Sequence, residues 1–167
     1  MSELTVKIKY FDRPDYTIRR LEKISKGDWI DLYAAEDKFI PEITPGEPYK
    51  PQFIPLGVAM KLPDGYEAHL APRSSEFKNF GLIQTNSVGI IDNSYCGDDD
   101  QWMQGVICLS GHDTIVKDGK TIYGTQIHKG DKICQFRIME TMPALSFKEM
   151  PHLEGKNRGG FGSTGRT

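Results

Sequence analysis

Two short polar motifs could carry chemistry in this sequence: GIIDNSYCGD at residues 89–98 and PRSS at residues 72–75. In the first motif two isoleucines precede Asp92 and a Gly-ended turn follows it, which can hold one carboxylate at the floor of a hairpin pocket. Tyr95 would then form an aromatic wall of that pocket. An Asp that opens a β-turn is more often a solvated turn residue, so the motif needs its companions before it indicates a site.

The PRSS motif opens the short helix that we expect over residues 72–81. Ser74 or Ser75 can cap the start of this helix, and Gly81 can end it in the left-handed conformation. The backbone N–H groups of a helix start and the guanidinium of Arg73 both suit phosphate oxygens, so an anion site is expected here. The alternative is an ordinary helix cap beside a surface arginine.

Strands must position these motifs, because apolar and polar residues alternate along most of the chain. We expect Asp31 to leave a strand with aromatic and β-branched neighbours, and Gln135 to face away from Cys134 and Phe136 on another strand. The segment 54–62 alternates without interruption, the VKDGKTI segment has the D-G turn of a hairpin, and residues 40–52 form a proline-rich loop. An all-β fold with one short helix follows.

Composition limits the class of protein. A chain of 167 residues has the usual length of a single domain. Its net charge of -2 and pI of about 6.1 leave no basic surface for nucleic acid. No apolar run reaches membrane-spanning length and the N-terminus is charged, so we expect a soluble, cytoplasmic protein without a membrane partner. Its three cysteines show no C-x-x-C spacing, which argues against a disulfide framework or a zinc knuckle.

The last segment, residues 153–167, differs in kind, because it combines glycines and cations with one aromatic residue. Such a composition cannot fold by itself and would ordinarily indicate a disordered tail. Linkers seldom keep an exposed aromatic, however, and Phe161 is framed by glycines. We therefore expect a flexible arm that closes over a ligand, with Phe161 stacked on a base and backbone N–H groups and cations near phosphate.

Five segments in this order, IDLYAAED, PRSS, GIIDNSYCGD, GDKICQF and RGGFGSTG, resemble the five motifs of the homotrimeric dUTPases, most strongly those of Gram-positive bacteria and their phages. The resemblance spans residues 27–165 and implies a distorted jelly-roll-like β-barrel over residues 1–152, with the arm at 153–167. It also implies a homotrimer with active sites shared between chains. The implied reaction is Mg²⁺-dependent hydrolysis of dUTP to dUMP and pyrophosphate, which keeps uracil out of DNA and supplies dUMP for dTMP synthesis.

The resemblance also implies a role for each motif residue. Asp92 would be the general base that activates water, and Tyr95 would pack against the deoxyribose. Asn86 and backbone groups near Gly89 would read the uracil edge. Mg²⁺ would be chelated mainly by the triphosphate, with Asp31 holding its bound waters. The remaining substrate contacts would come from Arg73, Ser74, Ser75, Gln135, Lys156, Arg158, Phe161, Gly162 and Ser163.

Departures from the family pattern leave alternatives open. Lys156 or Arg158 could meet the γ-phosphate, because the arm does not match the common R-G-x-G-G-F pattern. Residues 44–51 and 111–125 have no place in the minimal enzyme, and the second insertion is a candidate contact surface for a regulatory partner protein. Two other functions are alternatives: a dCTP deaminase of the same fold, and a trimeric regulatory protein that responds to nucleotide without hydrolysing it.

Overall fold

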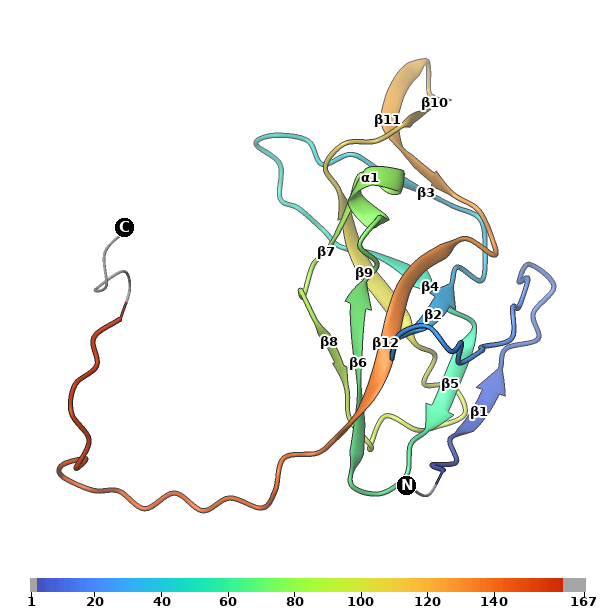
Figure 1. The fold of residues 1–167 in the computed structure, drawn as a ribbon. Helices are drawn as coiled ribbons and strands as arrows, with labels where there is room; N and C mark the ends of the chain where they lie inside the picture. The colour runs from blue at the N-terminus through green and yellow to red at the C-terminus, as the bar shows by residue number, and fades with distance from the viewer. Residues whose placement is uncertain (1–2, 161–167) are drawn as a thin grey trace.

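A computed structural model of the chain describes residues 3–160 (Figure 1). The described residues form short strands and one short helix, which confirms the expected all-β class. The elements are β1 Lys7–Tyr10, β2 Ile30–Tyr33, β3 Lys38–Pro41, β4 Gln52–Pro55, β5 Val58–Lys61, β6 Tyr66–Pro72, α1 Glu76–Phe80, β7 Leu82–Gln84, β8 Gly89–Ile91, β9 Met103–Cys108, β10 Asp113–Lys117, β11 Lys120–Ile127 and β12 Lys132–Glu140.

The strands pair into four small sheets, and within residues 3–160 their ladders do not close into a ring. The largest sheet has the order β2-β12-β6-β8, and all of its pairs are antiparallel. The other sheets have the orders β4-β9-β7, β10-β11-β3 and β1-β5. Because neighbours in these sheets are often distant in sequence, the chain crosses repeatedly between layers, and segments that carry separate motifs come to lie side by side.

The core lies between these sheets and follows the alternation that the sequence predicts. Leu32, Ile54 and Val106 have no solvent exposure and come from three different strands. Trp102 is 1% exposed and its ring meets that of Phe136 edge to face, with centroids 5.2 Å apart. Such a pair adds about 0.5–1.5 kcal/mol beyond the area it buries. The packed layer therefore fixes the outward-facing residues of the same strands.

The uninterrupted strand expected over residues 54–62 is wrong, because the chain breaks there into β4 and β5. Gly57 separates the two strands with a φ of +68°, which strands do not adopt. Its N–H group donates to Oε1 of the buried Gln101 at 3.0 Å. A Cβ at this position would lie 2.4 Å from Cδ1 of Ile18, so the break depends on glycine.

Residues 82–92 do not form a hairpin of their own, because β7 and β8 belong to different sheets. Ile83 on β7 pairs with Ile107 on β9, whereas Ile90 on β8 pairs with His69 on β6. Residues 85–88 connect the two strands. The alternation that marks two strands does not say which partner each strand takes, and the packed sheets decided it.

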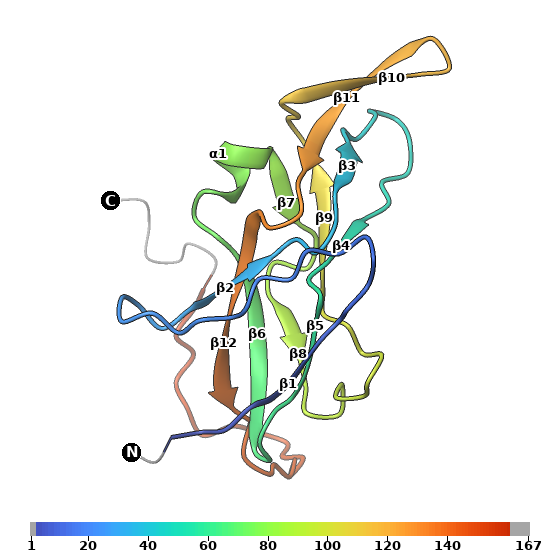
Figure 2. The ribbon, with the colours of Figure 1, turned by 90° about the vertical axis from the view of Figure 1, so that its right-hand side faces the viewer.

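Two turn predictions are confirmed by backbone angles. The D-G turn lies at the tip of the β10–β11 hairpin, where Asp118 and Gly119 have φ values of +52° and +73°. This hairpin projects from one end of the molecule beyond α1 (Figure 2). Gly81 ends α1 with a φ of +64° in the left-handed region. At the start of α1, Ser75 holds the cap position, but its side chain makes no capping hydrogen bond.

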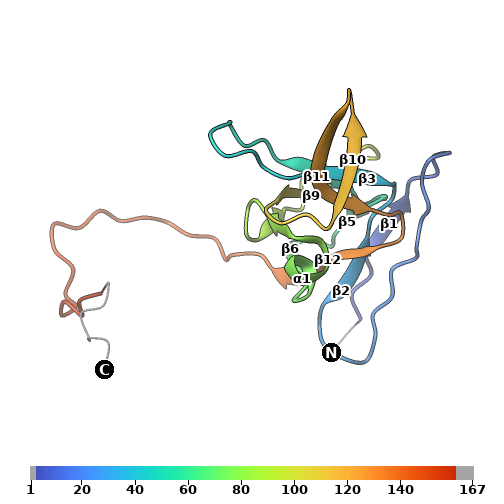
Figure 3. The ribbon, with the colours of Figure 1, turned by 90° about the horizontal axis from the view of Figure 1, so that it is seen from above.

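After β12 the described chain contains no further helix or strand. Thr141 donates its N–H group to the Gly65 carbonyl at 2.9 Å, and residues 142–160 then run away from the strands as an exposed segment (Figures 1 and 3). Phe147 in this segment is 96% exposed and Leu153 is 87% exposed. Over the described part of the chain, no helix is long and apolar enough to cross a membrane.

Candidate active site

The first half of the site is a cluster of charged residues on the outer face of the largest sheet. Asp31 on β2 accepts from Arg73 Nε at 2.9 Å through Oδ1 and lies 3.0 Å from Lys132 Nζ through Oδ2. The Asp31 side chain is 22% exposed, so both ion pairs are partly shielded from solvent. One carboxylate therefore orients two cations on the same surface.

Strand register explains why these residues meet. On β12, Cys134 and Phe136 are buried against the core, which turns the intervening Gln135 to the opposite face as expected. Gln135 lies opposite Asp31 on β2 and opposite Ala71 on β6. Its amide Nε2 donates to the Pro72 carbonyl at 3.0 Å, directly before Arg73. Three of the predicted motifs thus meet across three neighbouring strands.

The two serines of the PRSS motif lie beside this cluster at the start of α1. Ser74 is exposed and Ser75 is half-buried. The turn that carries them closes through a hydrogen bond from the Glu76 N–H group to the Arg73 carbonyl at 3.0 Å. Because neither serine is consumed by a side-chain cap of α1, their hydroxyls remain available to a ligand.

The second half of the site is the turn that begins at Asp92. The Tyr95 N–H group donates to the Asp92 carbonyl at 3.2 Å, which closes the expected β-turn. Asp92 Oδ1 accepts a hydrogen bond from the Ser94 hydroxyl and another from the Ser94 N–H group at 2.8 Å. These bonds to Ser94 hold the pKa of Asp92 below its ordinary value. Asp92 is thus an exposed, oriented carboxylate that is ionised at neutral pH.

Asp92 and Tyr95 border the same cavity, of about 370 Å³. The Tyr95 hydroxyl donates to the Gln101 carbonyl at 3.1 Å, which fixes the ring on one wall. Apolar side chains form most of the rest, and the complete lining is Phe53, Ile90, Ile91, Asp92, Tyr95, Gln101, Trp102 and Met103. A carboxylate at the edge of an apolar hollow suits a ligand with a flat apolar part and a polar part.

Asn86 lies on the connection that leads into β8, and Gly89 is the first residue of β8. Asn86 is exposed, while Gly89 is buried and pairs with Leu70 on β6. A Cβ built on Gly89 would come within 3.4 Å of both Asn86 Nδ2 and Leu70 Cβ. The glycine therefore allows the Asn86 amide to approach the backbone at the start of β8.

Within one chain the two halves of the site lie far apart along the sheet. Ile91 pairs with Ala68, so Asp92 lies one position beyond Ala68 toward the start of β6. Arg73 lies five positions from Ala68 in the opposite direction. Six strand positions correspond to about 20 Å. Figure 1 shows the two strands running in opposite directions, with β6 leading toward α1. No side chain spans that distance, so the structure brings Asp31, Arg73 and Gln135 together but not Asp92.

The predicted residues of the C-terminal arm are placed only in part. Lys156 and Arg158 are exposed and lie outside any helix or strand. Phe161, Gly162 and Ser163 lie outside the described residues. The roles predicted for these five residues, and the domain boundary at 152/153, stay predictions.

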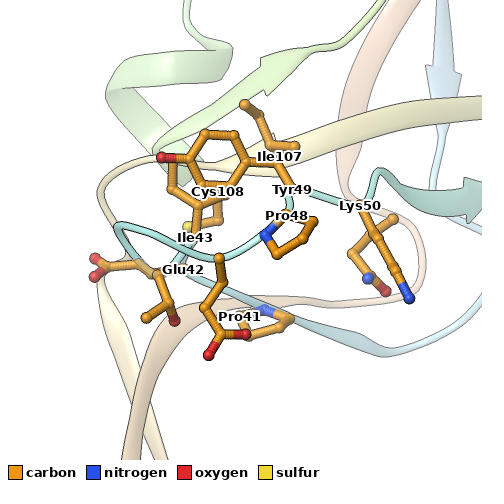
Figure 4. Close-up of a pocket in the computed structure, with 11 residues that line it drawn as sticks. Pro41, Glu42, Ile43, Pro48, Tyr49, Lys50, Ile107 and Cys108 are labelled. Atoms are coloured by element: carbon orange, nitrogen blue, oxygen red, sulfur yellow. The ribbon is translucent and has the colours of Figure 1, made fainter.

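A separate cavity of about 360 Å³ lies beneath the proline-rich loop and involves none of the predicted site residues (Figure 4). Residues 41–50 of the loop face Ile107 and Cys108 of β9 across this hollow. Glu42 is held in place because its Oε1 accepts from the Gly111 N–H group at 2.6 Å. Lys50 is the only cation among its lining residues, so this hollow does not suit a triphosphate.

Sequence reasoning missed several contributors. Lys132 stands in the GDKICQF motif three residues before Gln135, a spacing that places two side chains on opposite faces of a regular strand. A register shift between Lys132 and Cys134 in the pairing of β12 with β2 breaks this rule, and the sequence does not mark it. Ser94 orients Asp92, but its place in a turn gives no sign of this in the sequence. Phe53 and Met103 line the Asp92 cavity from other strands, and no local pattern marks them.

Comparison with known proteins identifies the family. The family model described as dUTPase matches residues 29–165. The chain belongs to the dUTPase family. This dUTPase-family chain is also 49% identical to the SPbeta prophage-derived deoxyuridine 5'-triphosphate nucleotidohydrolase of Bacillus subtilis over 162 residues, which cover 97% of the chain and 99% of that protein. The link to phages and Gram-positive bacteria is thereby confirmed.

Solved dUTPase structures share the fold. The Staphylococcus bacteriophage 80alpha dUTPase with dUPNHPP has a TM-score of 0.69 at 21% identity and covers 96% of this chain and 98% of its own. A mutant dUTPase of S. aureus phage phi11, described with a structural Mg(II) ion, has a TM-score of 0.65 at 21% identity and covers 90% and 99%. This likeness confirms the jelly-roll-like fold of the dUTPase family for the chain.

Proposed function

We propose that this protein hydrolyses dUTP to dUMP and pyrophosphate, with Asp92 as the general base. The observation that supports this most is the pairing of an oriented, ionised carboxylate with an aromatic wall at one cavity, while an acid, two cations and an amide gather on the same sheet. The relatives named above carry this activity in their names. The alternative roles of these residues as turn and surface residues do not explain why they match the five motifs in order.

In this mechanism the protein performs one proton transfer. Asp92 orients a water molecule and accepts its proton as the water oxygen attacks the α-phosphorus, and the bond to the bridging oxygen of the pyrophosphate leaving group breaks. Ser94 fixes the carboxylate so that its free Oδ2 can face the water. Positioned general bases contribute about 10²- to 10⁴-fold to rates.

The cluster around Asp31 stabilises the negative charge of the triphosphate. Arg73 uses Nε to reach Asp31, so the terminal nitrogens of its guanidinium remain for phosphate oxygens. Lys132 likewise keeps donors free beyond the one that meets Asp31. The serine hydroxyls and Gln135 would complete the contacts to the phosphate chain. Their orientation before substrate binds lowers the cost of reorganisation.

The residues present fit an indirectly held Mg²⁺. Both Asp31 oxygens already meet a cation, yet each carboxylate oxygen has two lone pairs and can also accept from a metal-bound water. In the described residues no group of three or more His, Cys, Asp or Glu side chains is arranged as a metal site. When bound to the triphosphate, the ion would neutralise negative charge.

We also propose that the working form is a homotrimer whose sites combine residues of different chains. The separation of about 20 Å between Arg73 and Asp92 supports this, because a single chain cannot place both at one phosphorus. Exposed apolar residues of the C-terminal segment, such as Phe147 and Leu153, would gain burial against a neighbouring chain. The arm would reach a neighbour's site with Phe161 over the uracil, and Lys156 or Arg158 at the γ-phosphate.

The proposed compartment is the cytoplasm, where nucleotide pools are maintained.

A pyrophosphate-release assay tests the proposal. Wild-type protein is assayed with dUTP, dCTP, dTTP and UTP, each with and without Mg²⁺. We expect release from dUTP alone at a substantial rate, because Tyr95 leaves no space for a 2'-hydroxyl and Asn86 favours uracil. Ammonia release from dCTP would instead establish a deaminase. Tight dUTP binding without pyrophosphate release would establish a regulatory protein.

A second function is supported by the β10–β11 hairpin, which we propose as a contact surface for a protein partner. Every residue of β10 is exposed, and Val116 and Tyr123 are 75% and 60% exposed. Apolar residues on a projecting hairpin are typical of protein contacts. Val116→Lys and Tyr123→Lys should leave dUTP hydrolysis unchanged, because neither side chain lines the cavity beside Asp92 or the cavity beside Arg73.

A further inference from the structure

A buried chain of three polar side chains runs beneath α1. Glu76 is 2% exposed, Gln84 4% and Gln104 0%. Gln104 Nε2 donates to Glu76 Oε1 at 2.6 Å and to Gln84 Oε1 at 3.1 Å. Gln84 Nε2 in turn donates to the Leu70 carbonyl at 3.1 Å and to the Ser87 carbonyl at 3.2 Å. The three residues come from α1, β7 and β9, whose ends lie together in Figures 1 and 2.

The direction of these hydrogen bonds is fixed from one end. The carbonyls of Leu70 and Ser87 can only accept, so Gln84 must present its NH₂ group to them. Its oxygen then faces Gln104, which must also present an NH₂ group. The same NH₂ group reaches Glu76, whose Oε1 must accept. Reversing either amide would set acceptor against acceptor in a buried site, so the chain has one orientation.

The two ends of this hydrogen-bond chain meet the phosphate-holding turn and the connection that carries Asn86. At one end, the Glu76 N–H group closes the turn that contains Arg73, Ser74 and Ser75. At the other end, Gln84 holds the carbonyl of Ser87, which directly follows Asn86 in the 85–88 connection. Both turns border one cavity of about 360 Å³, which Glu76 and Gln84 also line. No other side-chain hydrogen bonds found within residues 3–160 join these two turns.

Glu76 has no countercharge. None of the ion pairs found in the described chain involves it, and its neighbours Gln84 on β7 and Gln104 on β9 are neutral. From β12 the facing titratable group is Cys134, whose thiol pKa is raised by burial, by Glu76 and by Asp31. Burial raises the pKa of Glu76 to about 7, and the Gln104 hydrogen bond opposes this rise. Burying an acid without a neighbouring cation lowers the stability of the folded protein, so Glu76 is expected to have a role that offsets this cost.

We propose that Glu76 is a positioning residue that acts through Gln104 and Gln84 to hold the 85–88 connection in a fixed place relative to the Arg73–Ser75 turn. The inference rests on the proposed dUTP hydrolysis for its kinetic consequence. The hydrogen-bond chain itself couples the base-reading segment to the phosphate-holding turn. This coupling does not depend on the reaction. Glu76 touches no reacting atom and is not a catalytic residue.

Three variants separate positioning from mere stability. Glu76→Gln keeps an acceptor for Gln104 and should keep kcat/KM within about threefold of wild type. Glu76→Leu removes the acceptor and should lower kcat/KM at least about tenfold, mainly through KM, because Gln104 is no longer tied to α1 and the 85–88 connection loses its link to the Arg73–Ser75 turn. In the Glu76→Leu/Gln104→Leu double variant the Glu76–Gln104 pair is apolar and only Gln84 Oε1 loses its donor, so Tm should recover in part toward wild type while kcat/KM stays at least about tenfold low. Asn79→Ala, on the exposed side of α1, is the matched control and should match wild type.

Amide hydrogen exchange gives a readout without turnover. The N–H groups of residues 85–89 should exchange faster in Glu76→Leu and in the double variant than in wild type, Glu76→Gln or Asn79→Ala. Wild-type kinetics and exchange in the double variant would overturn the inference and leave Glu76 a structural residue. If wild-type protein releases no pyrophosphate from dUTP, the proposed function fails, and exchange at residues 85–89 still decides whether Glu76 positions this connection.

Discussion

Arg73 Nε lies 2.9 Å from Asp31 Oδ1, an ion pair between the turn before α1 and the strand β2. The two residues are far apart in sequence and belong to different motifs, yet β12 and its Gln135 lie between their strands. Because Asp31 also meets Lys132, a single carboxylate orients the cations that we assign to the triphosphate. A loss of this acid should therefore affect the phosphate half of the site and spare the base half.

The Asp31→Asn change tests that assignment. An amide keeps the shape of the side chain but removes the charge that holds Arg73 and Lys132, so both cations should lose their fixed orientation. We expect kcat/KM for dUTP to fall about 10- to 100-fold and the Mg²⁺ concentration for half-maximal activity to rise. Steady-state assays over a Mg²⁺ titration measure both. The exposed Asp98→Asn change serves as the control, and an equal effect of the two changes would contradict the assignment.

The Asp92→Asn change should remove turnover while substrate still binds. Asparagine can accept the same hydrogen bonds from Ser94 but cannot take a proton from water, so kcat should fall by about 10²- to 10⁴-fold or more. Pyrophosphate release measures turnover, and calorimetric titration with a non-hydrolysable dUTP analogue measures binding. Retained turnover would remove Asp92 from the mechanism.

The Phe161→Ala change tests the proposed closing arm. A ring that stacks on a base contributes about 1–3 kcal/mol, so kcat/KM for dUTP should fall by roughly 5- to 150-fold. Steady-state kinetics with dUTP provide the measurement, and Phe161→Tyr, which keeps an aromatic ring, should retain most activity. An unchanged kcat/KM in the alanine variant would mean that the arm does not take part.

Glu76 predicts how stability depends on pH. Its pKa is about 7 in the folded protein against an ordinary value of 4.5, so between these values the folded state binds more protons than the unfolded state. The stabilisation is complete below about pH 4.5 and is lost as pH rises toward 7, with a total of the order of 1–3 kcal/mol. Urea unfolding of wild type and Glu76→Gln across pH 5–8 isolates this contribution, because glutamine does not titrate. Parallel curves for the two proteins would contradict the prediction.

The pKa of Asp92 is shifted in the opposite direction to that of Glu76, so Asp92 provides an internal comparison. Its folded pKa is lowered by Ser94, so its contribution to stability is present above its ordinary pKa and is lost as pH falls through the folded value. The two carboxyl groups therefore act in separate pH ranges. A fall in stability from pH 5 to 7 that disappears in Glu76→Gln belongs to Glu76 alone.

The sequence by itself determined the local structure and the motif residues. Alternation predicted the strands and the outward face of Gln135, because a strand buries every second side chain when one sheet face is packed. Positive φ values are favourable for glycine, so Gly81 and the D-G turn at Gly119 were predictable. The order of five motifs predicted the family, which the family model confirms over residues 29–165.

Only the tertiary structure decided which segments meet. Strand pairing is non-local, so no pattern in the sequence assigned β7 to β9 and β8 to β6, or broke one alternating run at Gly57. The same packing brought Lys132 to Asp31, where two cations could share one acid. It also enclosed Glu76 with two amides, because burial of a polar side chain depends on residues from several strands at once and not on its own neighbours in sequence.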